Sequence, residues 1–217
     1  CGAVTGRMTH SSPNMAQIPS ESDYRTCFIV PEGNKLVGID ASGLELRMLA
    51  HYMKDSEYTD LILHGDIHTY NQEAAGLPSR NDAKTFIYAF LYGAGDAKIG
   101  SIVGGGAKEG AKLKAKFLKS LPSLRALLLK VQRIASSGTV PALDGRRVRV
   151  RSEHAALNSL LQSAGALVMK RALVIAIDKL NNYNYPYKLV AQVHDEFQVE
   201  VPEEYAERVG VVFRNAI

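Results

Sequence analysis

The sequence predicts an α+β fold, in which the two ends of the chain build a small antiparallel sheet around a mostly helical insertion. Two observations lead to this prediction. Short β-rich runs lie near both ends, at Lys35–Ile39, Leu189–Val193 and Phe197–Val201. Between them, apolar residues recur at the three- and four-residue spacing of amphipathic helices. The 217 residues are enough to bury a sizeable core in one large domain or two small ones.

The elements follow in order. Residues 1–33 are expected to form loops with short extended pieces, because turn signals occur at Ser11–Asn14 and Ile18–Ser20. The first strand ends in Asp40, and helical periodicity begins near Leu44 and runs to about Tyr52. Further helices are predicted near residues 57–64, 67–76, 80–92 and 107–135.

The second half contains a hairpin, a long helix and another hairpin. Turn residues Asp144-Gly145 and alternating side chains up to Val150 predict the first hairpin from Pro141 onward. A long helix is expected at about 153–180. The last two β-rich runs flank His194-Asp195-Glu196, which predicts a hairpin with acids at its tip, and an amphipathic helix should begin after Pro202.

Two local features favour ordinary structural roles. Gly104-Gly105-Gly106 matches neither a Walker-type phosphate loop nor a strand-led dinucleotide motif, so we interpret it as a flexible connection. A group of lysines on the following helix is typical of a solvated face, with contact to phosphate as the alternative. These lysines are Lys108, Lys112, Lys114, Lys116 and Lys119.

Composition excludes few functions. The chain is 46% hydrophobic and 22% charged, with a net charge of +4 that permits a polyanionic partner without requiring one. Cys1 and Cys27 show no metal-ligand spacing, and we expect both to be reduced in a cytoplasmic protein. No signal segment and no apolar run of membrane-spanning length is evident, so no membrane partner is predicted. Because the chain begins at Cys1 and stops at Ile217 inside a predicted helix, we expect it to be an internal segment of a longer protein.

Two aspartates lie at strand ends. Asp40 closes the first strand, and Asp195 is at the tip of the last hairpin. If both strands belong to one sheet, the two carboxylates can face each other and hold two Mg²⁺ ions about 3.5–4 Å apart. Either aspartate alone is more often a simple turn residue, and spacing does not establish the pair.

The segment from Arg80 to Gly93 has the sharpest pattern. Arg80, Lys84, Tyr88 and Tyr92 recur every four residues, which is about 40° per step on an α-helix, so they share one face. Cations can bind a triphosphate, and an aromatic ring can stack on a base and sugar. The order suits a nucleotide with its phosphates toward Arg80 and its base toward Tyr92. A solvated amphipathic helix is the alternative.

Taken together, these segments resemble DNA-directed DNA polymerases of family A. The residues within the motifs are most similar to those of the branch encoded by short-tailed (T-odd-like) bacteriophages. Asp40–Arg47, Arg80–Gly95 and Val193–Glu196 resemble the three polymerase motifs of the family, in the family's order. Further similar stretches are Thr5-Gly6-Arg7 with Pro13–Pro19, Asp66–Thr69, and Asn158–Gln162. The resemblance spans nearly the whole chain, and six segments in register are highly specific.

The resemblance implies three parts of a polymerase. Residues 1–60 would be the first part of the palm, 61–150 the mostly helical fingers, and 151–217 the second part of the palm. A DNA-gripping thumb, and often a 3′–5′ exonuclease domain, would precede residue 1 and is not in this sequence. We leave open whether the segment turns over alone, since it should hold primer-template weakly.

The resemblance also implies the chemistry, which is template-directed DNA synthesis in phage replication by two-metal nucleotidyl transfer from a dNTP to a primer 3′-hydroxyl. Asp40, Asp195 and the backbone carbonyl of Ala41 would hold two Mg²⁺ ions, which Mn²⁺ can replace. Lys84 would be catalytic as the group that protonates pyrophosphate. His194 and Glu196 would support the metal site and primer end.

For the nucleotide, Arg80 and Lys84 would grip the triphosphate, and His68 would add a phosphate contact. Tyr88 would pack by the sugar, which predicts tolerance of dideoxy terminators, and Tyr92 would stack by the templating position. Glu45 would exclude ribonucleotides. The expected contacts to primer-template DNA, besides His194, are Arg7, Gln17, Asn158 and Gln162.

Several points stay open. The role of His154 is unassigned, because most of the family has Arg there, although the phage branch also carries His. A single-subunit RNA polymerase shares this architecture, and Glu45 argues against it because an acid should clash with a ribose 2′-hydroxyl. The other rivals are a non-catalytic DNA-binding module and a hydrolase, which lacks an arranged nucleophile. Accessory replication proteins would bind through parts outside this segment.

Overall fold

The computed structural model describes residues 2–19 and 23–217 as two compact units. The first comprises residues 1–44 and 162–217, and the second comprises 45–161. These bounds differ from the predicted ones at 60 and 150, and the assignment of palm and fingers to the units stays a prediction. Cys1 and the turn signal at Ser20 lie outside the described residues. Cys27 is a free, exposed thiol.

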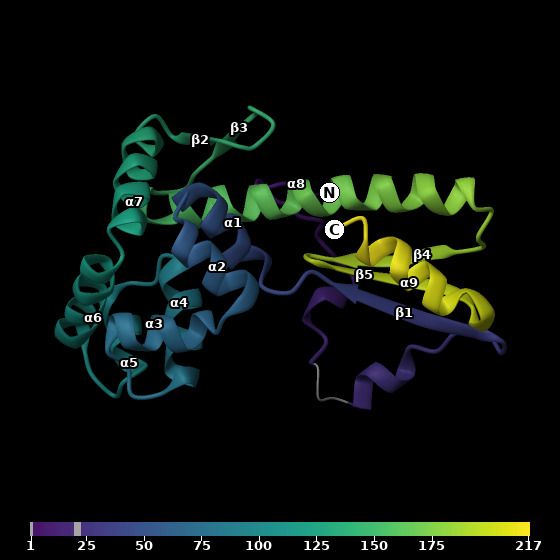
Figure 1. Cartoon of the computed structure of the whole chain (residues 1–217), viewed down its shortest axis with the longest axis horizontal. Coiled ribbons are helices and arrows are strands. Elements are labelled where there is room, and N and C mark those ends of the chain that lie inside the picture. The colour runs from purple at the N-terminus through teal and green to yellow at the C-terminus, as the bar shows by residue number, and fades with distance from the viewer. Residues whose placement is uncertain (1, 20–22) are drawn as a thin grey trace. The chain divides into compact units, whose positions relative to one another are not determined.

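The first unit is organised by an antiparallel sheet whose strand order is β1–β5–β4, formed by Asn34–Asp40, Glu196–Pro202 and Lys188–Val193 respectively. The sheet therefore joins the two ends of the chain, as predicted (Figure 1). Residues alternate along β5, so that Phe197, Val199 and Val201 are buried. Helix α9, Ala206–Arg214, covers that face, and its Phe213 ring lies 5.3 Å from the Phe197 ring.

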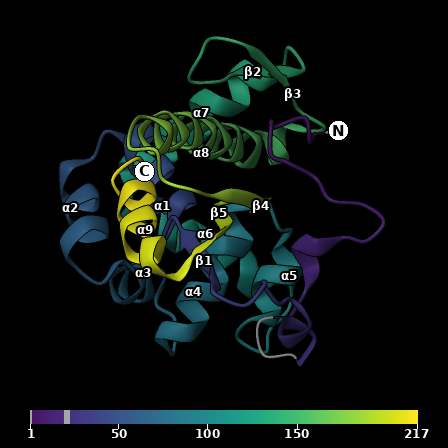
Figure 2. The same cartoon turned by 90° about the vertical axis from the view of Figure 1, so that its right-hand side faces the viewer.

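The long helix α8 spans Ala156–Asn182, just after a 3₁₀ turn at Glu153–Ala155 (Figure 2). By length and composition, the stretch Glu153–Asn182 is apolar enough to cross a membrane, contrary to the sequence interpretation. This is weak evidence for a span, because core helices of soluble proteins have the same composition, and half of its apolar window is buried inside the protein. Ala164, Met169 and Ala176 are among its fully buried residues.

The second unit is helical, apart from the small hairpin β2–β3. Its helices are α1, Leu44–Met53; α2, Ser56–His64; α3, Ile67–Ala75; α4, Arg80–Leu91; α5, Asp96–Ser101; α6, Ala107–Ser120; and α7, Pro122–Ala135. The strands β2 and β3 are Thr139–Pro141 and Arg147–Arg149, paired around the predicted turn. The core is centred on three rings, with Phe117 lying 5.1 Å from Phe86 and 5.5 Å from Phe90.

Polar caps explain where these helices begin. Asp55 accepts a hydrogen bond from Tyr58 N, and Asp66 accepts from His68 N and Thr69 N. Ser79 accepts from Asp82 N at the start of α4. These side chains satisfy N–H groups that have no partner inside the helix.

The insertion differs from the sequence prediction in three details. The helix expected over 107–135 is two helices, because Leu121 leaves the helical conformation and Pro122 begins α7. Helix α5, which lies just before Gly104-Gly105-Gly106, was not predicted. Lys114 is not merely solvated, since its Nζ donates to the Ala94 carbonyl at 2.7 Å and pairs with Asp96 at 2.9 Å.

Candidate active site

The first part of the site is the end of the sheet where β1 stops. Asp40 is the last residue of β1 and lies opposite Glu196 of β5. The β4–β5 turn consists of His194 and Asp195, because Val193 pairs with Glu196. The N–H of Ala41 donates to the carbonyl of Asp195 at 2.9 Å. This backbone clamp brings the Asp40-Ala41 corner and Asp195 together within one unit.

The backbone at the hairpin tip is unusual. His194 has a φ of 55°, in the left-handed region that non-glycine residues seldom adopt. Such conformations cost free energy and gather at functional sites. His194 is exposed, and the next residue, Asp195, is half-buried. The turn therefore presents His194 at the surface next to the predicted metal ligand.

Glu196 is on the outer face of the sheet, opposite α9. It shares this face with Gln198 and Glu200 because alternate residues of β5 point the same way. Its carboxylate accepts a hydrogen bond from Gln198 Nε2. A groove of about 420 Å³ runs over this face, and residues on both sides of Gln17 (Ala16 and Ile18) line it together with Glu196.

A further contact in this unit was not predicted. His10 Nε2 lies 2.9 Å from the carbonyl of Gln192 on β4. It ties the N-terminal segment that carries Arg7 and Gln17 to the strand leading into the hairpin. Nothing in the local sequence around His10 distinguishes it from a loop histidine, because its partner lies 182 positions along the chain.

The second part of the site is the outward face of α4. Ala83, Phe86, Ile87, Phe90 and Leu91 are buried on one side of this helix. On the other side Arg80, Lys84 and Tyr92 are exposed and Tyr88 is half-buried, as the spacing predicted. The Tyr88 and Tyr92 rings lie 6.4 Å apart, and the Tyr88 and His68 rings also lie 6.4 Å apart. One surface thus combines two cations, two phenols and an imidazole.

The α4 helix ends at a crowded corner. Gly93 has a φ of 75°, and a Cβ there would lie 2.6 Å from the His154 carbonyl oxygen. Only glycine fits both constraints. The structure thus places the backbone of His154, the residue left unassigned, against the end of the predicted nucleotide helix.

Glu45 is an acid inside the protein, with 8% of its surface exposed. The Tyr92 hydroxyl approaches Glu45 Oε1 at 3.5 Å, which is long for a hydroxyl hydrogen bond. The two residues predicted to act on the incoming nucleotide are therefore neighbours. This contact could not be predicted from the sequence, because the two residues are 47 positions apart.

His68 begins α3 and is close to several charges. Burial is the main cause that lowers the pKa of His68 below its usual range, and the positive charge of Arg80 adds to it. Its Nδ1 is buried without a hydrogen-bond partner, and the same holds for Asn158 Oδ1. Buried polar atoms normally have partners, so these two predicted site residues each lack one that a bound molecule can supply.

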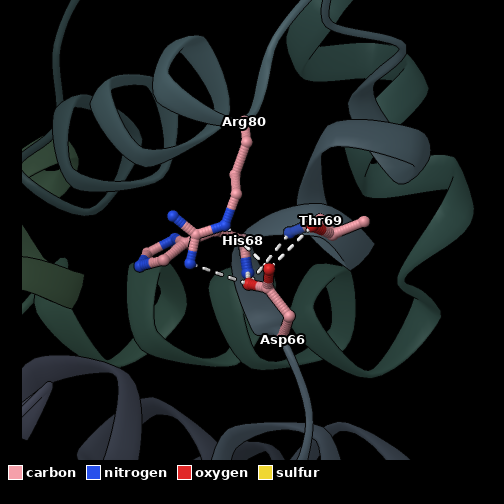
Figure 3. A network of polar contacts seen from close by, with 4 residues as sticks. All are labelled: Asp66, His68, Thr69 and Arg80. Carbon is pink, nitrogen blue, oxygen red and sulfur yellow. Dashed lines mark hydrogen bonds and ion pairs between the residues drawn. The ribbon is translucent and has the colours of Figure 1, made fainter.

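Asp66 is a site residue whose role the sequence did not reveal. Its carboxylate receives Nε and Nη2 of Arg80 at 2.7 and 3.1 Å, besides capping α3 (Figure 3). Hydrogen bonds from Arg80 and Thr69 hold the pKa of Asp66 well below its usual range, and the pairing raises the pKa of Arg80. An aspartate just before a helix predicts an N-terminal cap. It does not predict that the same carboxylate also binds an arginine.

The predicted residues thus fall into two groups. Asp40, Ala41, Asp195, Glu196 and His194 belong to the first unit, as do Arg7, Gln17 and Gln162. Glu45, His68, Arg80, Lys84, Tyr88, Tyr92 and Asn158 belong to the second. Within residues 2–19 and 23–217, no group of three or more His, Cys, Asp or Glu side chains is arranged to hold a metal ion.

Comparison with solved structures identifies the fold. The chain matches the polymerase domain of Pol1 from M. smegmatis, described as a complex with DNA primer-template and dNTP, with a TM-score of 0.88 at 23% identity. The match covers 99% of this chain and 42% of that one. The fold is therefore that of a polymerase domain, and the predicted α+β class is confirmed.

Sequence comparison gives the family. The model of DNA polymerase family A matches residues 1–217. The chain is 45% identical to the DNA-directed DNA polymerase of Enterobacteria phage T3, over 100% of this chain and 36% of the relative. It is 46% identical to that of Escherichia phage T7, over 91% and 33% respectively. The chain belongs to DNA polymerase family A, and it spans about a third of the length of these curated relatives.

Proposed function

We propose that this chain is the catalytic part of a DNA-directed DNA polymerase that copies phage DNA. It would transfer nucleotidyl groups from dNTPs to a primer 3′-hydroxyl under the direction of a template. The observation that carries the proposal is the backbone clamp, in which Ala41 N–H meets the Asp195 carbonyl at 2.9 Å. Two aspartates at motif positions of the family thereby belong to one corner of the sheet. The names of the phage relatives, and the DNA and dNTP bound by the M. smegmatis structure, support the same reaction.

The donors at this corner fit magnesium. Mg²⁺ prefers oxygen ligands and is commonly held by one or two carboxylates together with substrate phosphates, rather than by a complete protein cage. Two aspartates and the Ala41 carbonyl provide such a partial set, and Mn²⁺ would fit the same oxygens. When bound, the ions would supply activation of the 3′-hydroxyl and neutralisation of phosphate charge.

The exposed face of α4 would bind the nucleotide. Arg80 and Lys84 carry fixed positive charge toward the start of the helix, and their N–H groups suit phosphate oxygens. Lys84 would also pass a proton to the departing pyrophosphate. His68 would contribute its unpartnered Nδ1, and Tyr88 would contact the sugar. Closure of this helix over a correct base pair would then select the substrate.

The DNA would be held by residues of both units. Ala16, Ile18 and Glu196 share one groove, so Gln17 and the hairpin tip are suited to contact the primer end. In the other unit, the orphan Oδ1 of Asn158 would accept a hydrogen bond from the DNA. Contacts of this kind, together with Arg7, Gln162 and His194, would check the shape of the pair without reading sequence. We expect the reaction in the host cytoplasm, where phage DNA is copied.

Primer extension with Mg²⁺ and the four dNTPs tests the proposal in the intact protein. Asp40→Ala and Asp195→Ala should each lower extension by at least about a thousandfold, because each removes a ligand on which charge neutralisation depends. Glu203→Gln is the matched control, since this exposed acid of the same unit only pairs with Lys35. Full activity of either aspartate variant, with the wild-type melting temperature retained, would contradict the assignment.

A further inference from the structure

The Asp66 carboxylate both caps α3 and binds Arg80. Asp66 accepts Thr69 Oγ1 at 2.8 Å and the N–H groups of His68 and Thr69 at 3.1 and 3.3 Å. The same carboxylate accepts Arg80 Nε at 2.7 Å and Nη2 at 3.1 Å, one on each oxygen. Figure 3 shows the guanidinium lying across the start of α3, beside the His68 ring. The cap of one helix thus holds the first residue of another.

This arrangement contributes little to stability. The Arg80 and Asp66 side chains are 53% and 45% exposed, and ion pairs at such exposed positions add little to the free energy of unfolding. The geometry is nevertheless specific. The helix N–H groups fix the carboxylate, and the carboxylate in turn binds the guanidinium along one edge. The pair is therefore suited to orienting Arg80 rather than to holding the fold together.

The orientation leaves donors available. A guanidinium has five N–H groups in a rigid fork, of which Asp66 takes one on Nε and one on Nη2. About three remain for another acceptor. His68 belongs to the same cluster, because its backbone N–H donates to Asp66 Oδ1 at 3.1 Å and its ring lies 6.4 Å from the ring of Tyr88 on α4. The buried Nδ1 of His68 has no hydrogen-bond partner, which independently indicates that this cluster can bind a ligand.

We propose that Asp66 is a positioning residue for nucleotide binding, which fixes one edge of Arg80 so that the opposite edge meets the triphosphate. The inference rests on the proposed function, because it assumes that α4 binds the nucleotide. Asp66 itself does not touch the substrate. The ion pair persists while the nucleotide is bound, and the carboxylate acts entirely through Arg80.

A competing account predicts the opposite sign. If Asp66 only competed with the triphosphate for Arg80, or only repelled it, loss of its negative charge would tighten nucleotide binding. Positioning predicts weaker binding, because Arg80 would be released into many rotamers and would have to be ordered at each binding event. The sign of the change therefore distinguishes the two accounts.

The experiment is steady-state primer extension by the intact protein, with the KM for dNTP and kcat measured separately. Asp66→Asn keeps a good helix cap and removes the charge. It should raise the KM for dNTP about tenfold and leave kcat within about twofold, since a binding contact changes without a change at the reacting atoms. In an Arg80→Ala background, the same substitution should change KM by less than about twofold, because coupled residues are not additive.

Asp55→Asn is the matched control. Asp55 caps α2 in the same way and binds Ser123 rather than an arginine. It should leave KM unchanged, and thermal melting should show that both single variants are folded. A lower or unchanged KM for Asp66→Asn, or an equal rise with and without Arg80, would overturn the positioning role. If Arg80→Ala itself left KM unchanged, the proposed nucleotide site on α4 would fail as well, which separates the two failures.

Discussion

Glu45 is the residue whose environment says most about substrate choice. It is buried, and the Tyr92 hydroxyl is 3.5 Å from its Oε1. A buried acid resists displacement, because moving it or leaving it unpaired is costly. A carboxylate fixed beside the nucleotide site would therefore exclude an added hydroxyl by sterics and by lost hydrogen bonds.

We therefore predict that Glu45→Ala in the intact protein gains ribonucleotide use. The ratio of kcat/KM for dNTP over rNTP should fall about a hundredfold, which is the discrimination that a pocket typically exerts on one hydroxyl. Tyr92→Phe is the companion variant, because it removes only the hydroxyl partner and should lower the ratio less. An unchanged ratio in Glu45→Ala would show that another residue excludes the ribose.

At this scale, the sequence predicted the residues whose role depends on one helix or one turn. Arg80, Lys84 and Tyr88 could be placed on one face because helical periodicity is local. The partners of His10, Glu45 and Asp66 could not be predicted, because tertiary packing brings them together across 182, 47 and 14 positions.

Among the elements, the contact of α5 with α6 depends on two glycines. A Cβ at Gly110 would collide with the backbone carbonyl of Asp96, and one at Gly100 would collide with the carbonyl of Gly106. The helices approach each other through their backbones, which side chains would prevent. Gly106, from the stretch interpreted as a flexible connection, caps α6 and contributes its carbonyl to this close contact.

Gly110→Ala should therefore destabilise the protein by about 2–4 kcal/mol in urea unfolding, because a backbone clash cannot relax as a flexible side chain would. Helix propensity alone predicts a gain of about 1 kcal/mol. Gly210→Ala in α9 is the control, since a Cβ there meets only Val37 Cγ1 at 3.6 Å and should be neutral or stabilising. Equal effects at the two sites would refute the close-packing account.

The elements also show where pattern reading succeeds. Strands and helices with regular periodicity were predicted within a few residues, including β1 and α4. The prediction of a single helix over 107–135 was wrong. The apolar periodicity continues through Leu121, so the pattern gave no sign that the chain breaks at Pro122. Helix α5 escaped prediction because six residues are too few to show a period.

Over the whole molecule, the topology was the most predictable feature. The β-rich runs at the two ends need partners for their backbone N–H and C=O groups, which favours pairing between them, and β1 does pair with β5. The division between units was less predictable, because one boundary falls at the turn before α1, near Leu44, and the other near Leu161, inside the continuous helix α8. The relation of these units to palm and fingers stays a prediction.

Acid should weaken the fold through groups in both units. The lowered pKa of Asp66, Asp55, Glu109 and Glu200 comes first from hydrogen bonds to Arg80, Ser123, Gly106 N and Lys188 respectively. A carboxyl with a depressed folded pKa adds stability above its unfolded value and loses it as pH falls through the folded value. His68, also depressed, makes unfolding easier below about pH 6.5, because the unfolded chain then binds more protons.

The urea midpoint should therefore be highest near neutral pH, decline slightly below about pH 6.5, and decline further below about pH 4–5. Asp66→Asn should flatten this decline only slightly, since the exposed Asp66–Arg80 pair adds little to stability. A midpoint that stays constant from pH 7 to pH 3 would contradict the assigned hydrogen bonds.

The link between Ala41 and Asp195 is made by main-chain atoms alone. Any amino acid placed at position 195 still offers that carbonyl, so this one hydrogen bond does not depend on the acid that the turn displays. If the proposed function holds, a variant disarmed at this position should keep the link between the two segments, and it would act as a decoy that binds primer ends without extending them.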